Sequence, residues 1–374
     1  MKVIWSLICV LLVLGALCLC ASADYSTLPE EYVALESYIP GELGQLLPDG
    51  LFSSDPEQAS RALGELTSFA GLLQLVLDVC RVHLSDSGLL LASLCALLIL
   101  CALMRGLGTA YGTGGLASLA PRICLFCAVA GAGYAAISDM VEFFGELRVL
   151  MGGMLPMMTA LYVLGGNVTR ASAGNALLGV WLNVCERVCA KIAPPLFACC
   201  LAMKLPLVFE APLDLSKLGE GLKKTYTSVL GALTFVLTLC LSAQNLITGK
   251  ADSVAMRSGR YAIGQIIPVV GGALSGSLDT LAAGVGLLRG VSGVCGVLLV
   301  LLLCLPMLAK TLILRAIFDA AGGMAHMLGC APESTVLSEA SSLFGYMAAA
   351  VAMCSAVFVL ALGAFAACAA AFAP

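Results

Sequence analysis

Few residues in this sequence have the type and spacing that catalysis or metal binding needs. The two histidines, His83 and His326, lie in different regions of the chain, so no HExxH motif or histidine metal cluster can form. Gly249 and Lys250 lack the upstream glycine and the following Ser or Thr of a phosphate-binding P-loop. We therefore predict that the chain is not an enzyme and holds no cofactor and no metal ion.

The 18 cysteines do not suggest a disulfide framework, because most of them lie in long apolar runs where a thiol behaves as a small hydrophobic group. Cys124 and Cys127 form a CxxC pair, but there is no second pair at zinc spacing and no thioredoxin-like context. We predict that both pack as buried apolar side chains. The cysteines in apolar runs include Cys95, Cys101, Cys240, Cys295, Cys304, Cys354 and Cys368.

The stretch from Ile266 to Thr280 combines helix-weakening residues with one acid. Pro268 lacks a backbone donor and Gly271-Gly272 weakens a helix, so we predict a kinked or broken span. A broken helix at membrane depth is tolerated only against protein or a water-filled cavity. Asp279 faces a cavity or a partner if it lies at depth, and it is simply hydrated if it lies near the outer interface.

Small residues spaced by four begin in the same stretch, with Gly272 and Gly276 followed by Ala282, Gly286 and Gly290. Such faces let helices approach closely in lipid. Two interpretations remain open, namely packing within the chain and assembly with another subunit or a second copy. The candidate residues for a cavity or packing span are Pro268, Gly271, Gly272, Gly276 and Asp279.

The composition indicates that lipid covers these elements. Hydrophobic residues make up 60% of the chain and charged residues 11%, and the mean hydropathy is +1.02. Soluble domains carry about 25% charged residues, so too few charges are present to coat a globule. Long apolar runs without alternation favour membrane helices over a barrel. No basic cluster indicates binding to nucleic acid.

Three regions follow one another along the chain. Residues 1–23 have the basic start, apolar core and A-x-A end of a cleavable signal peptide, with an uncleaved anchor as the alternative. Residues 24–87 carry eleven acids against Arg61 and Arg81, and we predict that this segment is exported. From Asp55 to Leu84 it predicts an amphipathic helix with an apolar stripe that includes Leu77 and Leu84. This helix either packs on the membrane domain or lies in the interface, or it docks a protein partner.

Residues 88–374 are predicted to form the membrane domain, giving an all-α, polytopic protein with about seven or eight spans. Basic loops favour the cytoplasmic side, which predicts Arg105, Arg122 and Lys310 inside and Asp139 and Glu333 outside. The separate crossings in this arrangement include Gly88–Met104, Ile123–Ser138, Val149–Gly166, Ile263–Leu288, Gly290–Ala309 and Ile317–Cys330.

The stretch Ile267–Thr280, the small residues after it and the run Val294–Ala309 ending at Lys310 resemble the stage III sporulation protein AE family. The resemblance covers most of the chain after about Gly88. It implies a membrane subunit of a channel complex that links mother cell and forespore, located in the mother-cell membrane around the forespore. It also implies partners among the other stage III sporulation membrane proteins, including a separate ATPase subunit, and carries over no catalytic residue.

A second function remains open from the sequence, namely an autonomous secondary transporter with a substrate site at a broken helix. Transporters often show paired interruptions in corresponding halves of the chain. The interruption from Pro268 to Gly276 has only a weak counterpart at Gly152-Gly153 with Pro156. This asymmetry favours the subunit over the transporter.

Overall fold

The computed structural model describes residues 69–111, 116–164, 186–204, 217–229 and 271–370, and a few helical positions between 176 and 239. All its regular elements in these ranges are helices, which confirms the all-α prediction for this part of the chain. They are α5 (Phe69–Tyr111), α6 (Leu116–Leu164), the π-helix η2 (Glu186–Ile192), α8 (Ala193–Ala202), α11 (Gly271–Met327) and α12 (Ala331–Ala370). Residues 217–229 form a further helical stretch.

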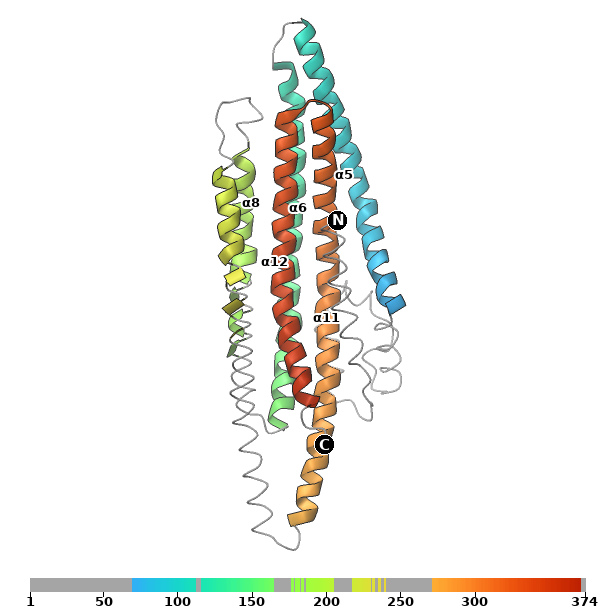
Figure 1. Ribbon diagram of the computed structural model, residues 1–374, viewed down its shortest axis with the longest axis vertical. Coiled ribbons are helices and arrows are strands. Elements are labelled where there is room, and N and C mark those ends of the chain that lie inside the picture. The colour runs from blue at the N-terminus through green and yellow to red at the C-terminus, as the bar shows by residue number, and fades with distance from the viewer. Residues whose placement is uncertain are drawn as a thin grey trace.

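Helices α11 and α12 form an antiparallel hairpin at the centre of the bundle (Figure 1). A Schellman motif ends α11: the N–H of Gly329 donates to the carbonyl of His326, and that of Cys330 to the carbonyl of Ala325. Gly329 has a φ of 73°, which strains any residue with a Cβ. The sequence therefore turns the chain sharply at this glycine, and α12 begins two residues later.

The two hairpin helices pack closely along their length. The rings of Phe318 and Phe344 stack with their centroids 5.2 Å apart. Nearer the hairpin loop, Ser334 Oγ of α12 donates to the carbonyl of Gly322 of α11 at 3.0 Å. The largest fully buried side chains of the bundle include Phe318, Phe344, Phe358, Leu94, Leu98, Leu125, Met140 and Leu147.

Helices α5 and α6 lie against this hairpin (Figure 1). Met154 of α6 fills the space beside Gly296 of α11 that a Cβ there would occupy. Fifteen residues earlier in α6, Asp139 pairs with Lys310 of α11 at 2.6 Å. From the first contact to the second, α6 steps back fifteen residues while α11 advances fourteen residues. The two helices therefore run antiparallel and stay in contact over about four turns.

A side arm, which we define as residues 186–204 and 217–229, stands beside α6 and α12 (Figure 1). Phe197 of α8 lies directly on Gly133 of α6, where a Cβ would collide with its ring. The same ring meets Phe344 of α12 edge-on, with centroids 6.0 Å apart. One aromatic side chain therefore contacts both core helices.

Within the described residues, four helical segments are long and apolar enough to cross a membrane: Val76–Leu107, Leu119–Pro156, Cys295–Met327 and Ala331–Ala356. The membrane character is thus supported, whereas the predicted count of seven or eight spans is not confirmed. The predicted signal peptide lies outside the described residues.

Several predicted crossings are parts of single continuous helices, and their prediction as separate crossings is wrong. Ile123–Ser138 and the described part of Val149–Gly166 both belong to α6. The described parts of the three predicted crossings between Ile263 and Cys330 lie on α11, apart from its C-cap residues. At 1.5 Å per residue the 57-residue α11 is roughly 85 Å long, more than twice the ~30 Å of a bilayer core.

The exported segment also differs from its prediction. Its predicted helix is present from Phe69 onward, and α5 runs without interruption past Ser87 into the predicted membrane domain. The predicted apolar stripe includes Leu77 and Leu84, but both are exposed, while Val76 and Val79 are buried. A different face of this helix therefore packs against the bundle.

Candidate functional site

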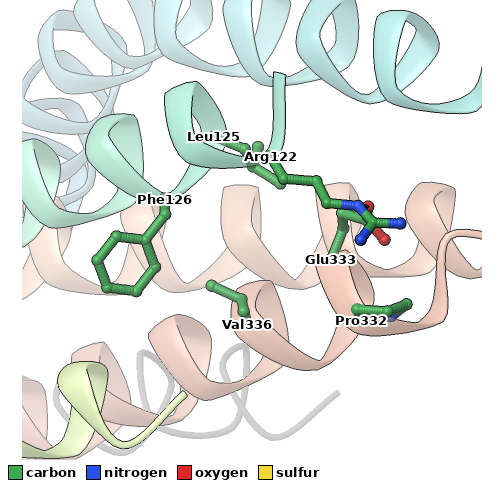
Figure 2. A pocket seen from close by; sticks show the side chains of 6 residues that line it. All are labelled: Arg122, Leu125, Phe126, Pro332, Glu333 and Val336. Atoms are coloured by element: carbon green, nitrogen blue, oxygen red, sulfur yellow. Dashed lines mark ion pairs between the residues drawn. The ribbon is translucent and has the colours of Figure 1, made fainter. Parts of the chain in front are cut away.

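The first buried charged site lies where α12 begins. Arg105 of α5 places Nη2 3.2 and 3.1 Å from the two carboxylate oxygens of Glu333, and its Nη1 donates to the carbonyl of Gly329 at 2.7 Å. From α6, Nε of Arg122 lies 2.9 Å from Oε1 of the same carboxylate as an ion pair. Figure 2 shows the Arg122 side chain extending from α6 toward Glu333. The site therefore ties the hairpin turn to both α5 and α6.

Burial differs among the members of this first site. The side chains of Arg122 and Glu333 are 2% and 3% exposed, whereas Arg105 is 31% exposed. A cavity of about 10 Å³ adjoins the pair and is lined by Leu125, Phe126 and other apolar groups. A buried charge is costly when its opposite charge is removed. Loss of the Glu333 charge should therefore cost more stability through buried Arg122 than through Arg105, which water can reach.

The second buried charged site lies six residues further along α12, at Glu339. Lys223 places Nζ 2.7 Å from Oε1, and Lys204 places Nζ 3.6 Å from Oε2. Lys223 Nζ also donates to Ser342 Oγ at 3.3 Å and lies 5.8 Å from the ring centroid of Tyr346. These three side chains of α12 face the side arm, which supplies both lysines.

Two findings correct the predicted topology. Arg105 and Arg122 were predicted on the opposite side of the membrane from Glu333, yet all three form one site. Lys310 and Asp139 were likewise predicted on opposite sides, yet they pair at 2.6 Å. The prediction placed each group of charged residues in a loop between two spans. A membrane helix can instead continue past a charged residue when a neighbouring helix supplies a residue of opposite charge, as Asp139 and Lys310 do for each other.

Four of the five predicted candidate residues lie in the first turns of α11, and the fifth precedes this helix in the sequence. Pro268 is outside the described residues. Gly271, Gly272, Gly276 and Asp279 lie on an uninterrupted helix, so the predicted break does not fall among them. Their side-chain surroundings are outside the described part, and their role as a cavity or packing span stays a prediction.

The CxxC pair also differs from its prediction, because Cys124 and Cys127 are both exposed on α6 instead of buried. By contrast Cys101, Cys295, Cys304 and Cys354 are buried as predicted, and the cysteines whose side chains are described are not joined in disulfides. Within the described residues, no group of three His, Cys, Asp or Glu side chains could hold a metal ion.

The sequence reasoning missed Glu333 and Glu339, although a signal was present. Both acids open an otherwise apolar stretch that continues without charge to Ala370. Ionisable groups within membrane helices usually face protein and pair with one another. Their bases, however, are supplied by segments more than a hundred residues away, which only the fold reveals.

Comparisons of the sequence with known proteins identify its family. The profile of the stage III sporulation protein AE family matches residues 61–369. The chain is 24% identical over 282 residues to the stage III sporulation protein AE of Bacillus subtilis (strain 168), which covers 74% of this chain and 70% of the relative. No solved structure matches. The chain belongs to the stage III sporulation protein AE family.

Proposed function

We propose that the protein is a membrane subunit of a sporulation-specific export or channel complex that links mother cell and forespore and is needed for forespore development. Family membership supports a role in sporulation, and the apolar helices support a membrane location. The proposed location is the mother-cell membrane around the forespore. The proposed partners are other stage III sporulation membrane proteins, a separate ATPase subunit and further copies of this chain.

The observation that favours a subunit is the way the bundle uses its buried charges. Glu333 and Glu339 each meet two basic side chains from other segments, so these charges hold helices together. The cavity that Glu333 lines measures about 10 Å³, and a second one between the side arm and the core measures about 20 Å³. Each is about the size of one water molecule and too small for a larger solute.

A secondary transporter finds less support. Its substrate site was expected at a broken helix from Pro268 to Gly276. The part from Gly271 to Gly276 lies on continuous α11, and Pro268 lies outside the described residues. The subunit is therefore the function that we carry forward.

Purification from sporulating cells of the native host tests this function. Affinity-tagged protein, cross-linked before solubilisation, should bring down an ATPase and other sporulation membrane proteins. Deletion of the gene should lower the count of heat-resistant spores by several orders of magnitude. Normal spore counts, or capture of no other sporulation membrane protein, would refute the proposal.

The helix that begins at Gly271 offers a sharper comparison between the two functions. Gly272→Leu and Gly276→Leu add bulk where small residues let helices approach, and we expect both to reduce partner capture. Asp279→Asn keeps shape but removes charge, and we expect a mild effect. Full capture by both leucine variants, with sporulation lost only in Asp279→Asn, would favour the transporter instead.

A further inference from the structure

Two groups of paired charges mark two levels along the bundle. At the hairpin turn, Arg105 of α5 and Arg122 of α6 meet Glu333 of α12. Further along the bundle, Asp139 of α6 pairs with Lys310 of α11. We call the first group the turn layer and the second the middle layer.

The two layers are separated by nearly the same distance on three helices. On α6 they are seventeen residues apart, or about 26 Å at 1.5 Å per residue. On α11, Lys310 precedes Gly329, whose carbonyl binds Arg105, by nineteen residues, or about 28 Å. On α5 the charged residue that precedes Arg105 is Asp86, which is also nineteen residues away. This spacing matches the ~30 Å hydrocarbon core of a bilayer.

Between the two layers, α5 and α6 carry no charged residue and expose large apolar side chains. Leu89 and Ile99 of α5 and Ile123 of α6 are all exposed, Leu89 by 80%. Tyr134 of α6 is 77% exposed five residues from the middle layer, where the amphipathic ring of a tyrosine suits the edge of a bilayer. Exposed apolar side chains with no charge among them indicate a surface that hydrocarbon covers.

Beyond the middle layer the outward surface of both helices becomes mixed. Asp78 and Arg81 of α5 and Glu142 of α6 are exposed there, among exposed apolar residues. The strongly apolar run of α11 in this half of the bundle is enclosed by protein instead, since every residue from Cys295 to Val300 is buried. A run that neighbouring helices cover needs no lipid, so this half can lie in water.

The side arm and one face of α11 are excluded from the lipid surface. Lys224 of the arm follows Lys223, which pairs with Glu339 between the two layers, and Lys224 is exposed. Asp319 of α11 is also exposed, ten residues from Gly329. A charge in hydrocarbon is costly, so these faces are turned toward water or protein. The lipid surface is therefore that of α5 and α6, and α5 lies at the edge of the bundle (Figure 1).

From this arrangement we propose that the bilayer surrounds the bundle between the turn layer and the middle layer, with hydrocarbon against the outward faces of α5 and α6. The rest of the bundle projects from the membrane. The part of α11 from Gly271 to Lys310, about 58 Å long, lies on the projecting side. This placement rests on the membrane location in the proposed function and not on the channel complex.

Tryptophan substitutions on α5 test the placement, because bromine atoms on lipid chains quench indole rings that touch hydrocarbon. The full-length protein is reconstituted in phosphatidylcholine vesicles with or without bromine at the middle of the acyl chains. The emission of the unmodified chain, which has two tryptophans, is subtracted. Ile99→Trp, roughly 9 Å inside the Arg105 level, should lose about half of its emission in the brominated vesicles.

Leu77→Trp is the matched control. Leu77 is a similarly exposed apolar residue of the same helix, but it lies about 13 Å beyond Asp86. Its tryptophan should keep its emission in brominated vesicles and lose it to iodide in the water. Val149→Trp on α6, about 15 Å beyond the middle layer, should behave in the same way.

The outcomes separate the placement from the membrane location itself. Lipid quenching of Leu77→Trp or Val149→Trp as strong as that of Ile99→Trp would overturn the placement but leave the membrane location. If Ile99→Trp does not fold, Ala96→Trp at an exposed position of α5 replaces it. Absence of lipid quenching at both positions would overturn the placement and the membrane location together.

Discussion

Removal of the Glu333 charge is the perturbation that best tests how this bundle is held together. Glu333→Gln keeps the size of the side chain and one acceptor oxygen but removes the carboxylate charge that lies 2.9 Å from the enclosed Arg122 side chain. Breaking a buried pair by removing one partner costs about 3–5 kcal/mol. Arg105 is 31% exposed and can be hydrated, so Arg105→Gln should lower the free energy of unfolding by only about 1 kcal/mol or less.

The double variant Arg122→Leu with Glu333→Leu provides the decisive comparison. Replacing a buried ion pair by apolar groups is often neutral, so this variant should recover most of the loss seen in Glu333→Gln. The free energy of unfolding is measured by SDS titration in mixed micelles, followed by the fluorescence of buried Trp181. Glu220→Gln, at an exposed acid of the side arm, serves as the control and should change nothing.

Two outcomes would refute this reasoning. One is a loss below about 1 kcal/mol in Glu333→Gln, which would mean that water reaches the pair despite its 2% and 3% exposure. The other is a double variant as unstable as the single one, which would mean that the charges contribute through contacts other than their own pairing.

Two further predictions use residues with matched controls. Gly133→Ala places a methyl group where the Phe197 ring lies and should destabilise the protein by about 1–3 kcal/mol. Gly131→Ala meets open space and should be neutral or stabilising. Equal effects of the two variants in the same SDS titration would contradict this packing. Burial raises the pKa of the Cys330 thiol, and the Glu333 carboxylate raises it further. Maleimide should therefore label Cys330 more slowly than exposed Cys199, and the rate at Cys330 should increase as the pH rises. Equal labelling rates of the two cysteines at pH 7 would show that Cys330 is accessible.

The general class of this fold could be predicted because composition decides it. A chain with 11% charged residues must bury its backbone groups in helices when lipid surrounds it. The continuity of the helices could not be predicted in the same way. Asp139 and Lys310 both suggest loops when read in sequence, but each offsets the charge of the other, and their helices continue past them.

The candidate site followed a similar pattern. Pro268 and the glycines after it were predicted as a cavity or packing span because helix-weakening residues can be recognised in the sequence itself. The ion pairs were missed because a partner such as Lys223 is identified only by the packing of the side arm against α12. Cys124 and Cys127 were assigned to the interior because apolar runs do not reveal which face of a helix is exposed.

The two acids of α12 serve different neighbours because of helix geometry. At 3.6 residues per turn, the six residues from Glu333 to Glu339 turn the side chain by about 240°, so the carboxylates point about 120° apart. One reaches α5 and α6 and the other the side arm, while Ser334, one residue and about 100° from Glu333, donates to a carbonyl of α11. A single acid could not make both contacts. Helix α12 is thus the element on which the other described segments converge, and its charges lie where they do because three different surfaces meet there.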